Sequence, residues 1–227
     1  MSNGNIAFWN NKIAILRQAK LLDQTNPPKI ILASTSHYRK ALLDKFKIPF
    51  VQLDPEYKEY DQPGESPLHK ASRSALGKAQ SIVSGHEIDP PFVVIGSDQV
   101  AHMGEQRFGK PGSVVAARKQ LAASSGNWVS FTSAICLIDD RGRIKQAVES
   151  YRIRFRPLLA AEIDTYLDID RPFDCAGSIK AESLGITLLQ DCRGRDINTL
   201  YGLPLMLLQE ALSQLGWQLS ALRNPHS

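Results

Sequence analysis

Residues 29–46 of the chain, KIILASTSHYRKALLDKF, decide the fold class. The run KIILA (29–33) is apolar and as short as a buried strand, STS (34–36) is a polar turn, and residues 37–46 have the apolar spacing of a helix. Ser36 is placed to cap this helix, because a serine side chain accepts a hydrogen bond from an N–H group of the first turn. A strand that passes through a short polar turn into a helix is typical of an α/β domain.

The rest of the chain continues this alternation and adds a hairpin. An extended segment over 48–53 and a dense strand over 91–96 accompany helices expected over 66–84, 114–123, 160–168 and from about Leu203. Two alternating segments, WVSFTSAICLI (128–138) and KQAVESYRIRF (145–155), flank the turn DDRGR and predict an antiparallel hairpin. We therefore predict an α/β fold with a mixed, twisted sheet flanked by helices, and an antiparallel hairpin in its second half.

Length and composition limit the number of domains and the class of partner. With 227 residues, 43% of them hydrophobic, the chain has enough apolar side chains for one large domain. We expect an N-terminal extension over 1–28, one domain over 29–220 and a short tail over 221–227. The extension has roughly helical apolar spacing, at Ile13, Leu16, Ala19 and Leu21. The formal charge of +4 is mild and spread along the chain, which suits an enzyme that binds phosphate and does not indicate nucleic-acid binding.

The cysteines and the N-terminus bear on the compartment. Three cysteines stand far apart, at Cys136, Cys175 and Cys192, so neither a disulfide framework nor a zinc site is indicated. No apolar run approaches the ~18 residues of a membrane-spanning helix, and the N-terminus lacks the basic and apolar regions of a signal peptide. We expect a cytoplasmic protein with no membrane partner. The sequence leaves the oligomeric state open, a homodimer included.

The turn over 34–36 is the first candidate for binding phosphate. A turn that opens a helix offers backbone N–H groups and the positive end of the helix dipole, and Ser34 and Arg39 add a hydroxyl and a guanidinium there. From this segment alone, a helix cap beside a solvated arginine is roughly twice as common an outcome. No G-x-x-x-x-G-K-[ST] pattern exists in the chain, so a P-loop is excluded.

A second set of candidates consists of charged residues. Asp98 follows the strand over 91–96, and the ends of strands in an α/β sheet often hold reacting groups. Its carboxylate can bind a divalent cation or remove a proton from water, although an aspartate after a strand forms a turn about as often. Glu59, Lys78 and Lys110 are further candidates, but for a lone lysine a solvated surface charge is the commoner outcome. Arg73 and Lys78 lie five residues apart on one expected helix and point in different directions, so they need not share a ligand.

Several motifs occur in a fixed order along the chain. ASTSHYRKALLDKF (33–46) is followed by VIGSDQV (94–100), GKP (109–111) and SGN (125–127), and then by PFDCAGSIKAESLGI (172–186) and DINTLYGLPL (196–205). In this order they resemble the motifs of the Maf family of nucleotide pyrophosphatases, over residues 29 to about 215. The strings STS, SDQV and CAGS-x-K-x-E are most similar to the branch of that family acting on 7-methyl-GTP. The branch acting on dTTP and UTP tends to show SDT and a late glutamine.

The resemblance implies a fold and a role for each matched residue. The fold would be Maf-like, similar to that of inosine-triphosphate pyrophosphatases. Asp98 would accept a proton and, with Glu59, hold the family's usual activator, Mg²⁺ or Mn²⁺. The residues implied in phosphate binding are Ser34, Arg39, Lys78 and Lys110, and those implied in base selection are Tyr38, Gln99 and Glu182.

The chain departs from the family pattern at three places. HY (37–38) stands where Pro-Arg or Pro-Trp is usual, Lys58 replaces the acid before Glu59, and SA (133–134) stands where Thr-Gly is usual. Lys58 would put a base beside the implied metal site and weaken metal binding. Tyr38 would stack less strongly on a base than a tryptophan, which would lower selectivity.

The chemistry of 7-methylguanine fits the residues implied in base selection. Its ring carries delocalised positive charge, so an aromatic face such as that of Tyr38 stabilises it by ~0.5–2 kcal/mol. Its Watson–Crick edge has two adjacent N–H donors that the Glu182 carboxylate can accept together. The plainer alternative is surface packing for Tyr38 and a solvated loop position for Glu182.

We therefore predict an enzyme that hydrolyses the α–β phosphate bond of a nucleoside triphosphate, 7-methyl-GTP in particular, to a monophosphate and pyrophosphate. One alternative is a dTTP/UTP or broad-specificity pyrophosphatase, against which Gln99 and Glu182 argue. The other is a non-catalytic nucleotide-binding regulator of cell division, against which the joint presence of all the implied catalytic residues argues.

Overall fold

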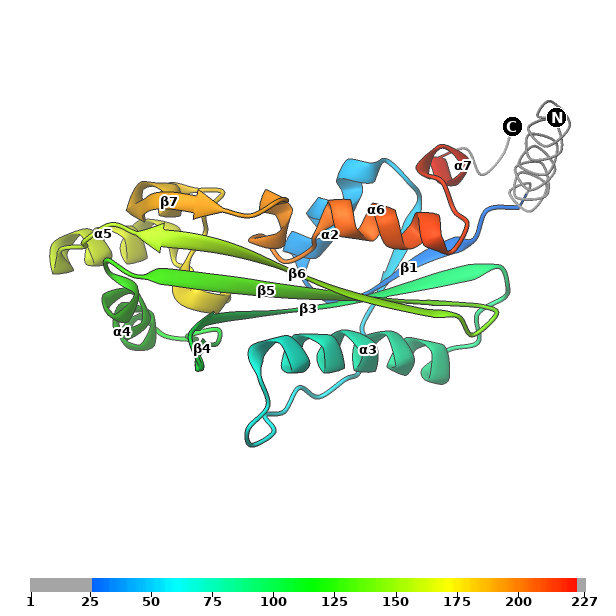
Figure 1. Ribbon diagram of the computed structural model, residues 1–227, viewed down its shortest axis with the longest axis horizontal. Helices are drawn as coiled ribbons and strands as arrows, with labels where there is room; N and C mark the ends of the chain where they lie inside the picture. The colour runs from blue at the N-terminus through cyan, green and yellow to red at the C-terminus, as the bar shows by residue number, and fades with distance from the viewer. Residues whose placement is uncertain (1–25, 224–227) are drawn as a thin grey trace, which may run out of the picture.

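A mixed β-sheet organises the chain, with helices on both of its faces (Figure 1). The computed structural model describes residues 26–223, so the helical spacing expected before residue 26 lies outside the described residues. Within that range the strand order is β2-β1-β3-β5-β6-β7, and β4 pairs with β3. The strands are β1 (Lys29–Ala33), β2 (Phe50–Leu53), β3 (Phe92–Met103), β4 (Gln106–Phe108), β5 (Trp128–Asp139), β6 (Ile144–Phe155) and β7 (Leu189–Arg193).

The α-helices are α2 (His37–Leu43), α3 (Pro67–Gly85), α4 (Val114–Ser124), α5 (Ala160–Asp170), α6 (Leu205–Gln214) and α7 (Leu219–Arg223). Short 3-10 turns are η1 (Asp44–Phe46), η2 (Ala176–Ser178), η3 (Leu184–Leu188) and η4 (Ile197–Thr199). The helices α2, α3 and α4 each begin after a serine whose side chain caps the first turn. The Ser36 side chain accepts a hydrogen bond from the Arg39 N–H, so the predicted cap of this helix is confirmed, and Ser66 caps α3 in the same way by accepting one from the His69 N–H.

The predicted mixed sheet and hairpin are confirmed, and one strand boundary is wrong. The strand expected over 91–96 continues to Met103, so Asp98 lies inside β3 and not beyond its end. The reason is that β3 changes partners. Parallel β1 accompanies it only from Phe92 to Gly96, whereas antiparallel β5 pairs with it from Val93 to His102 and extends it. The helix expected over 37–46 also ends as α-helix at Leu43 and finishes as η1.

The change of partners leaves one edge of β3 open. Pairing with β1 stops at Gly96, and pairing with β4 starts at Ala101. Between them, among the described residues, the stretch 97–100 is paired with β5 alone. Successive side chains of a strand point to opposite faces, so this short stretch presents groups to both faces of the sheet.

Two helical layers bury the half of the sheet that contains β1. On one face α2 and α6 contribute Leu43, Leu208 and Leu212 to a core with Ile95 and Leu137. On the other face α3 lies along the strands, as Figure 1 shows. Helix and strand can lie this close because the residues at their contact are small. A Cβ on Gly96 of β3 would collide with the Ala75 carbonyl oxygen of α3.

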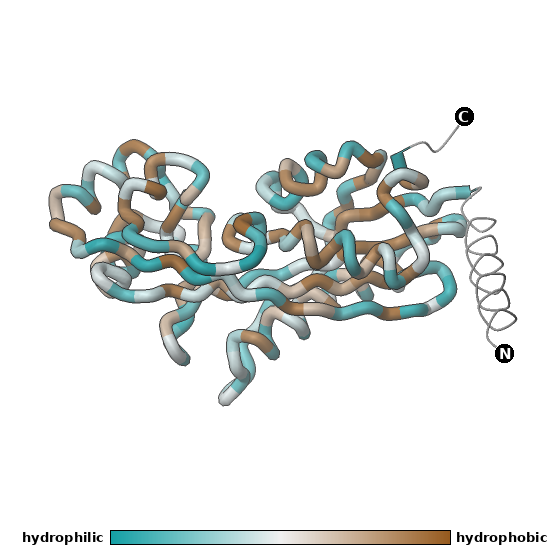
Figure 2. Tube along the Cα trace, turned by 45° about the horizontal axis from the view of Figure 1, so that its top comes forward, coloured by the Kyte–Doolittle hydropathy of each residue, from teal (hydrophilic) through white to brown (hydrophobic). Residues whose placement is uncertain are grey.

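The far half of the same strands carries a separate core. There α4 and α5 pack with the ends of β5 and β6 around Phe131, Ile153, Tyr166 and Leu121, which are almost fully buried. Figure 2 shows the two groups of helices and loops side by side along the long strands. At the C-terminal side, Leu222 of α7 is buried in the first core. No helix within residues 26–223 has the length and apolar character needed to cross a bilayer.

Candidate active site

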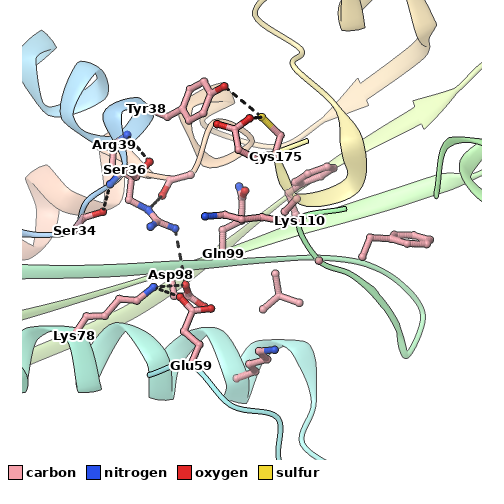
Figure 3. Close-up of a pocket in the computed structure, with 18 of the residues that line it drawn as sticks. Ser34, Ser36, Tyr38, Arg39, Glu59, Lys78, Asp98, Gln99, Lys110 and Cys175 are labelled. Atoms are coloured by element: carbon pink, nitrogen blue, oxygen red, sulfur yellow. Dashed lines mark hydrogen bonds and ion pairs between the residues drawn. The ribbon is translucent and has the colours of Figure 1, made fainter. Parts of the chain in front are cut away.

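A cleft of about 1110 Å³ lies at the open edge of β3 (Figure 3). Its walls come from the turn before α2, the loop between β2 and α3, α3 itself, the β4–α4 connection and the loops around η2 and η4. The sequence-predicted residues that line it are Ser34, Tyr38, Arg39, Glu59, Lys78, Asp98, Gln99, Lys110 and Glu182. All nine thus share one cleft, although they span most of the chain. Lys58, which was expected beside the metal site, is not among the lining residues.

Two carboxylates meet at the ammonium group of Lys78. Lys78 Nζ lies 2.7 Å from Asp98 Oδ1 and 2.5 Å from Glu59 Oε1, and it donates a hydrogen bond to each. Lys78 is only 6% exposed, so the expectation of a solvated surface lysine is wrong for this residue. The reason is its place on the face of α3 that packs on the sheet, with Ala71 and Ala75. Lys110, in contrast, is exposed.

Arg73 confirms that the two candidate cations of α3 serve different ligands. Its guanidinium forms two hydrogen bonds of 2.7 Å to the Glu65 carboxylate and one of 3.1 Å to the Tyr57 hydroxyl. These contacts hold the loop between β2 and α3 against the helix. Since Glu59 belongs to that loop, Arg73 supports the site from outside it.

The environment separates the pKa values of the two carboxyls. Burial raises the pKa of Asp98 above its ordinary value, although Lys78 and Arg39 both act to lower it. For Glu59 burial also acts upward, but the attraction and hydrogen bond of Lys78, with Arg39 and Lys110, outweigh it and lower the pKa. Glu59 therefore stays ionised, while Asp98 is the more basic carboxylate. A carboxylate with a raised pKa is suited to removing a proton from water.

Arg39 brings a second cation to Asp98. Its Nε donates a 3.0 Å hydrogen bond to the Gly202 carbonyl oxygen, and its Nη2 lies 3.9 Å from Asp98 Oδ1. The turn before α2 is held in shape from within, because the Ser36 N–H donates to Ser34 Oγ at 3.1 Å. Gln52 of β2 adds hydrogen bonds to the carbonyl oxygens of Ser34 and Ser36. Arg39 is thus fixed at its tip by a loop that is distant in sequence.

Gln99 lies on the opposite face of β3 from Asp98. Its Nε2 donates hydrogen bonds to the carbonyl oxygens of Thr199 (2.7 Å) and Leu200 (3.0 Å) and to Ser133 Oγ (3.2 Å). The amide nitrogen is fully used by these acceptors, so the group that Gln99 has left to offer a ligand is its Oε1 atom. Ser133, which the sequence comparison treated only as a departure, is the buried residue that supports this orientation.

Tyr38 and Cys175 close the cleft on the Gln99 side. Cys175 Sγ donates a 3.4 Å hydrogen bond to the Tyr38 hydroxyl, and burial raises the pKa of the Cys175 thiol to about 12. The Tyr38 ring also packs against His37, with ring centroids 3.9 Å apart. Glu182 lines the same part of the cleft. Cys175 was not selected from the sequence, yet it stands in the motif PFDCAGSIKAE, which could have identified it.

The sequence of this chain matches a known family along nearly the whole described range. The family model described as "Maf-like protein" matches residues 29–215. The chain belongs to the Maf family. It is 44% identical over 200 residues to a 7-methyl-GTP pyrophosphatase of Alcanivorax borkumensis, covering 88% of this chain and 99% of the relative. It is 43% identical over 198 residues to the protein of the same description from Bordetella avium, covering 87% and 98%.

Solved structures resemble this member of the Maf family more distantly. A nucleoside-triphosphatase, dITP/XTP pyrophosphatase, from Mycobacterium abscessus aligns with a TM-score of 0.39 and 19% identity, covering 57% of this chain and 75% of that one. A Ham1 protein from Staphylococcus aureus aligns with a TM-score of 0.40 and 15% identity, covering 56% and 71%.

The divalent metal that the Maf resemblance implies would find two carboxylate ligands in this cleft. Within residues 26–223 no group of three or more His, Cys, Asp or Glu side chains converges as a metal cage. Glu59 and Asp98 do converge, on one point beside Lys78. Mg²⁺ is commonly bound by one or two carboxylates together with substrate phosphates. The donor set therefore fits a metal that arrives with a phosphorylated ligand.

Proposed function

We propose that this Maf-family protein is a nucleotide pyrophosphatase that hydrolyses the α–β phosphate bond of 7-methyl-GTP. The observation that carries the proposal is the buried Asp98 carboxylate, which lies between Lys78 and Arg39 at the centre of a polar cleft. The names of the relatives support the same activity and the same substrate.

The reaction needs a base and a set of cations. Asp98 accepts a proton from the water that attacks the α-phosphorus, as the bond from that phosphorus to the bridging oxygen breaks. The products are the nucleoside monophosphate and pyrophosphate. Lys78, Arg39 and Lys110 stabilise the negative charge that grows on the phosphates, in a site whose groups are already in place. The main-chain and hydroxyl groups of the turn at Ser34 add polar contacts on the same side.

A divalent cation, Mg²⁺ or Mn²⁺, is part of the proposal. Glu59 and Asp98 would hold it together with phosphate oxygens. It would supply further positive charge to the phosphates. Lys78 already occupies the point where the two carboxylates meet, so metal binding requires this ammonium group to give up part of its contact with them.

Base selection is proposed for the other face of β3. Gln99 Oε1 and the Glu182 carboxylate are both acceptors, and the Watson–Crick edge of guanine presents N–H donors to them. Tyr38 offers an aromatic face to the cationic methylated ring. UTP and dTTP have one N3–H flanked by carbonyl oxygens, so they would leave one of these two acceptors unpaired in the complex, which disfavours them relative to guanine.

The test is a panel of 7-methyl-GTP, GTP, dTTP and UTP, scored for pyrophosphate release with and without Mg²⁺ or Mn²⁺. We expect the highest kcat/KM for 7-methyl-GTP, and a loss of discrimination against the pyrimidines in Glu182→Gln, because an amide offers a donor as well as an acceptor. A preference for dTTP or UTP in the wild type would refute the choice of substrate. Absence of pyrophosphate release from every triphosphate would refute the activity.

The cysteines and the composition of the cleft support a proposal for the compartment and the partners of the enzyme. The cysteines Cys136, Cys175 and Cys192 are all free thiols, which supports a reducing compartment such as the cytoplasm. We propose a single nucleotide as the occupant of the cleft, and no nucleic-acid or membrane partner. A homodimer is compatible with the cleft, since every residue assigned to it comes from this one chain.

A further inference from the structure

Two more cations line the same cleft, and no motif selects them. Lys70 of α3 and Arg107 of β4 both bind the carboxylate of Asp61, which lies in the loop between β2 and α3. Lys70 Nζ is 2.5 Å and Arg107 Nη1 is 2.9 Å from Asp61 Oδ1. One oxygen atom thus receives hydrogen bonds from two cationic groups, as an oxygen of a bound phosphate does.

The sheet register puts this cluster on the phosphate side of the cleft. Arg107 is directly opposite His102 in the pairing of β4 with β3. His102 is four residues from Asp98 along β3, so Arg107 lies on the same face as Asp98 and on the opposite face from Gln99. Lys70 precedes Lys78 by eight residues on α3, which is roughly two turns or about 12 Å along the helix axis. Lys78, Lys70 and Arg107 therefore form a row of cations along the Asp98 side of the cleft.

The three partners differ in their exposure. The side chains of Lys70 and Arg107 are 18% and 27% exposed, whereas that of Asp61 is 71% exposed. The Asp61 carboxylate accepts hydrogen bonds from both cations, so Lys70 and Arg107 already hold a carboxylate group at this point of the cleft. Asp61 can move into water without leaving a buried carboxylate behind, while Lys70 and Arg107 stay attached to α3 and β4 at the wall of the cleft. Ion pairs with so exposed a partner contribute little to stability.

We propose that Lys70 and Arg107 form a further anion subsite, which takes the terminal phosphate of the substrate, and that Asp61 occupies this subsite until phosphate displaces it. The inference rests on the proposed function, because that function puts the phosphate chain on the Asp98 face. It has a consequence for chain length: a nucleoside triphosphate reaches the subsite, and the corresponding diphosphate, one phosphate shorter, does not. Asp61 then acts as an internal competitor of the terminal phosphate.

The primary test is calorimetric binding of inorganic pyrophosphate to the full chain, because it does not depend on turnover. Arg107→Ala should weaken binding by about tenfold, since a charge-assisted contact is lost. Asp61→Asn should strengthen binding several-fold, because the competing charge is gone. Arg118→Ala is the matched control: this arginine of α4 pairs with the exposed Asp164, outside the lining of the cleft, and its loss should change nothing. Thermal unfolding of each variant checks that the fold is retained.

The outcomes distinguish an anion subsite from the alternative that Asp61 only holds the loop between β2 and α3 in place. If Asp61 only holds the loop closed, Asp61→Asn weakens pyrophosphate binding and the proposal is overturned. Binding by Arg107→Ala equal to that of Arg118→Ala also overturns it. A second arm compares kcat/KM for 7-methyl-GTP and 7-methyl-GDP, and Arg107→Ala should lower only the value for the triphosphate. A wild type that binds pyrophosphate in this pattern but hydrolyses neither nucleotide would keep the subsite and refute the proposed function.

Discussion

At the scale of single residues, Asp98 combines properties that rarely occur together on a carboxyl group. It is 4% exposed, it receives a hydrogen bond from Lys78, and a second cation, Arg39, lies 3.9 Å away. Burial favours the protonated form of Asp98, whereas the two cations favour its ionised form. The effect of burial is the larger one, so the pKa of Asp98 is raised. The role of base that we propose for Asp98 rests on this balance.

Asp98→Asn should abolish turnover while the fold survives. Asparagine keeps the shape and still accepts the Lys78 hydrogen bond, but it can neither take a proton nor carry the charge that a metal requires. The measurement is single-turnover hydrolysis beside a thermal unfolding curve. Activity within a few-fold of the wild type would remove Asp98 from the mechanism.

The dependence of kcat/KM on pH should reflect the raised pKa of Asp98. The base form increases as pH rises through the pKa, so kcat/KM should fall on the acid side. Because burial raises that pKa, the midpoint of the acid limb should lie above the ordinary aspartate value of ~3.9. A profile of kcat/KM from pH 4 to 9, with the nucleotide concentration far below KM, would show it. A limb centred at or below the ordinary value would mean that another group acts as base.

Lys78 and Lys110 should differ in their effect on stability, although both line the cleft and both are proposed to bind the phosphates. Lys78→Ala leaves the buried Asp98 without its closest cation, and we expect a loss of ~3 kcal/mol in the free energy of unfolding together with a large loss of kcat/KM. Lys110 is exposed, so Lys110→Ala should change stability by less than ~0.5 kcal/mol and lower kcat/KM alone. Urea unfolding and steady-state kinetics on both variants decide this. Equal stability of the two would contradict the buried ion pair.

The sequence predicted which residues form the cleft better than it predicted their burial and their partners. The resemblance to the Maf motifs selected all nine residues that now share the cleft, yet Lys78, considered as a lone lysine, was expected on the surface. Its burial was readable, since it continues the helical spacing of Ala71 and Ala75 on the sheet-facing side of α3. The partners of Gln99 were not readable, because Thr199 and Ser133 are brought to it only by tertiary packing. Asp61, Lys70 and Arg107 come from a loop, a helix and a short strand that no local pattern links.

At the scale of elements, the contact of α3 with β3 sets the distance between Lys78 and Asp98. The helix lies close to the strand because Gly96 has no side chain at the crossing point, where a Cβ would meet the Ala75 carbonyl oxygen and, at 2.9 Å, the Ala79 amide nitrogen. The atoms in the way are backbone, so they cannot rotate aside. The strand β3 was predicted too short because its apolar run ends near Gly96, whereas the residues beyond Gly96 are kept in the strand by pairing with β5.

Replacing Gly96 of β3 by alanine should therefore destabilise the protein far more than replacing Gly85, the last residue of α3. We expect it to lower the free energy of unfolding by ~3 kcal/mol through overpacking and to reduce kcat/KM in the remaining folded protein. Gly85→Ala is the matched control, since nothing lies within 4 Å of the added Cβ, and it should change stability by less than about 1 kcal/mol. Denaturant titration of both variants is the measurement. A Gly96→Ala variant as stable as the control would mean that α3 is not held at this distance.

At the scale of the whole molecule, three long strands join two cores. The strands β3, β5 and β6 have 12 residues each and run from the core around α6 to the core around α5. The cleft lies between these cores, so residues from both contribute to it. Neither half can lose its strands without removing support from the other.

Unfolding should accordingly be a single transition. Trp128 lies at the far end of β5 between Arg152 and Arg193, and Trp217 is buried in the core around α6, so each reports on one half. In a Trp9→Phe background, the single-tryptophan variants Trp128→Phe and Trp217→Phe should show the same urea midpoint by fluorescence, and it should coincide with the loss of circular dichroism. Separate midpoints would show that the halves unfold independently.

The open edge of β3 has a consequence for how such an enzyme can diversify. The group assigned to the chemistry, Asp98, and the group assigned to the choice of base, Gln99, are separated by a single peptide bond and lie on opposite faces of the sheet. A point substitution at position 99 can thus alter which nucleotide is accepted and leave the reaction untouched. An insertion or deletion of one residue between Gly96 and Ala101 would exchange the two faces and destroy both properties together. Lineages that descend from this architecture can therefore change the residue at position 99, but neither Asp98 nor the length of this segment.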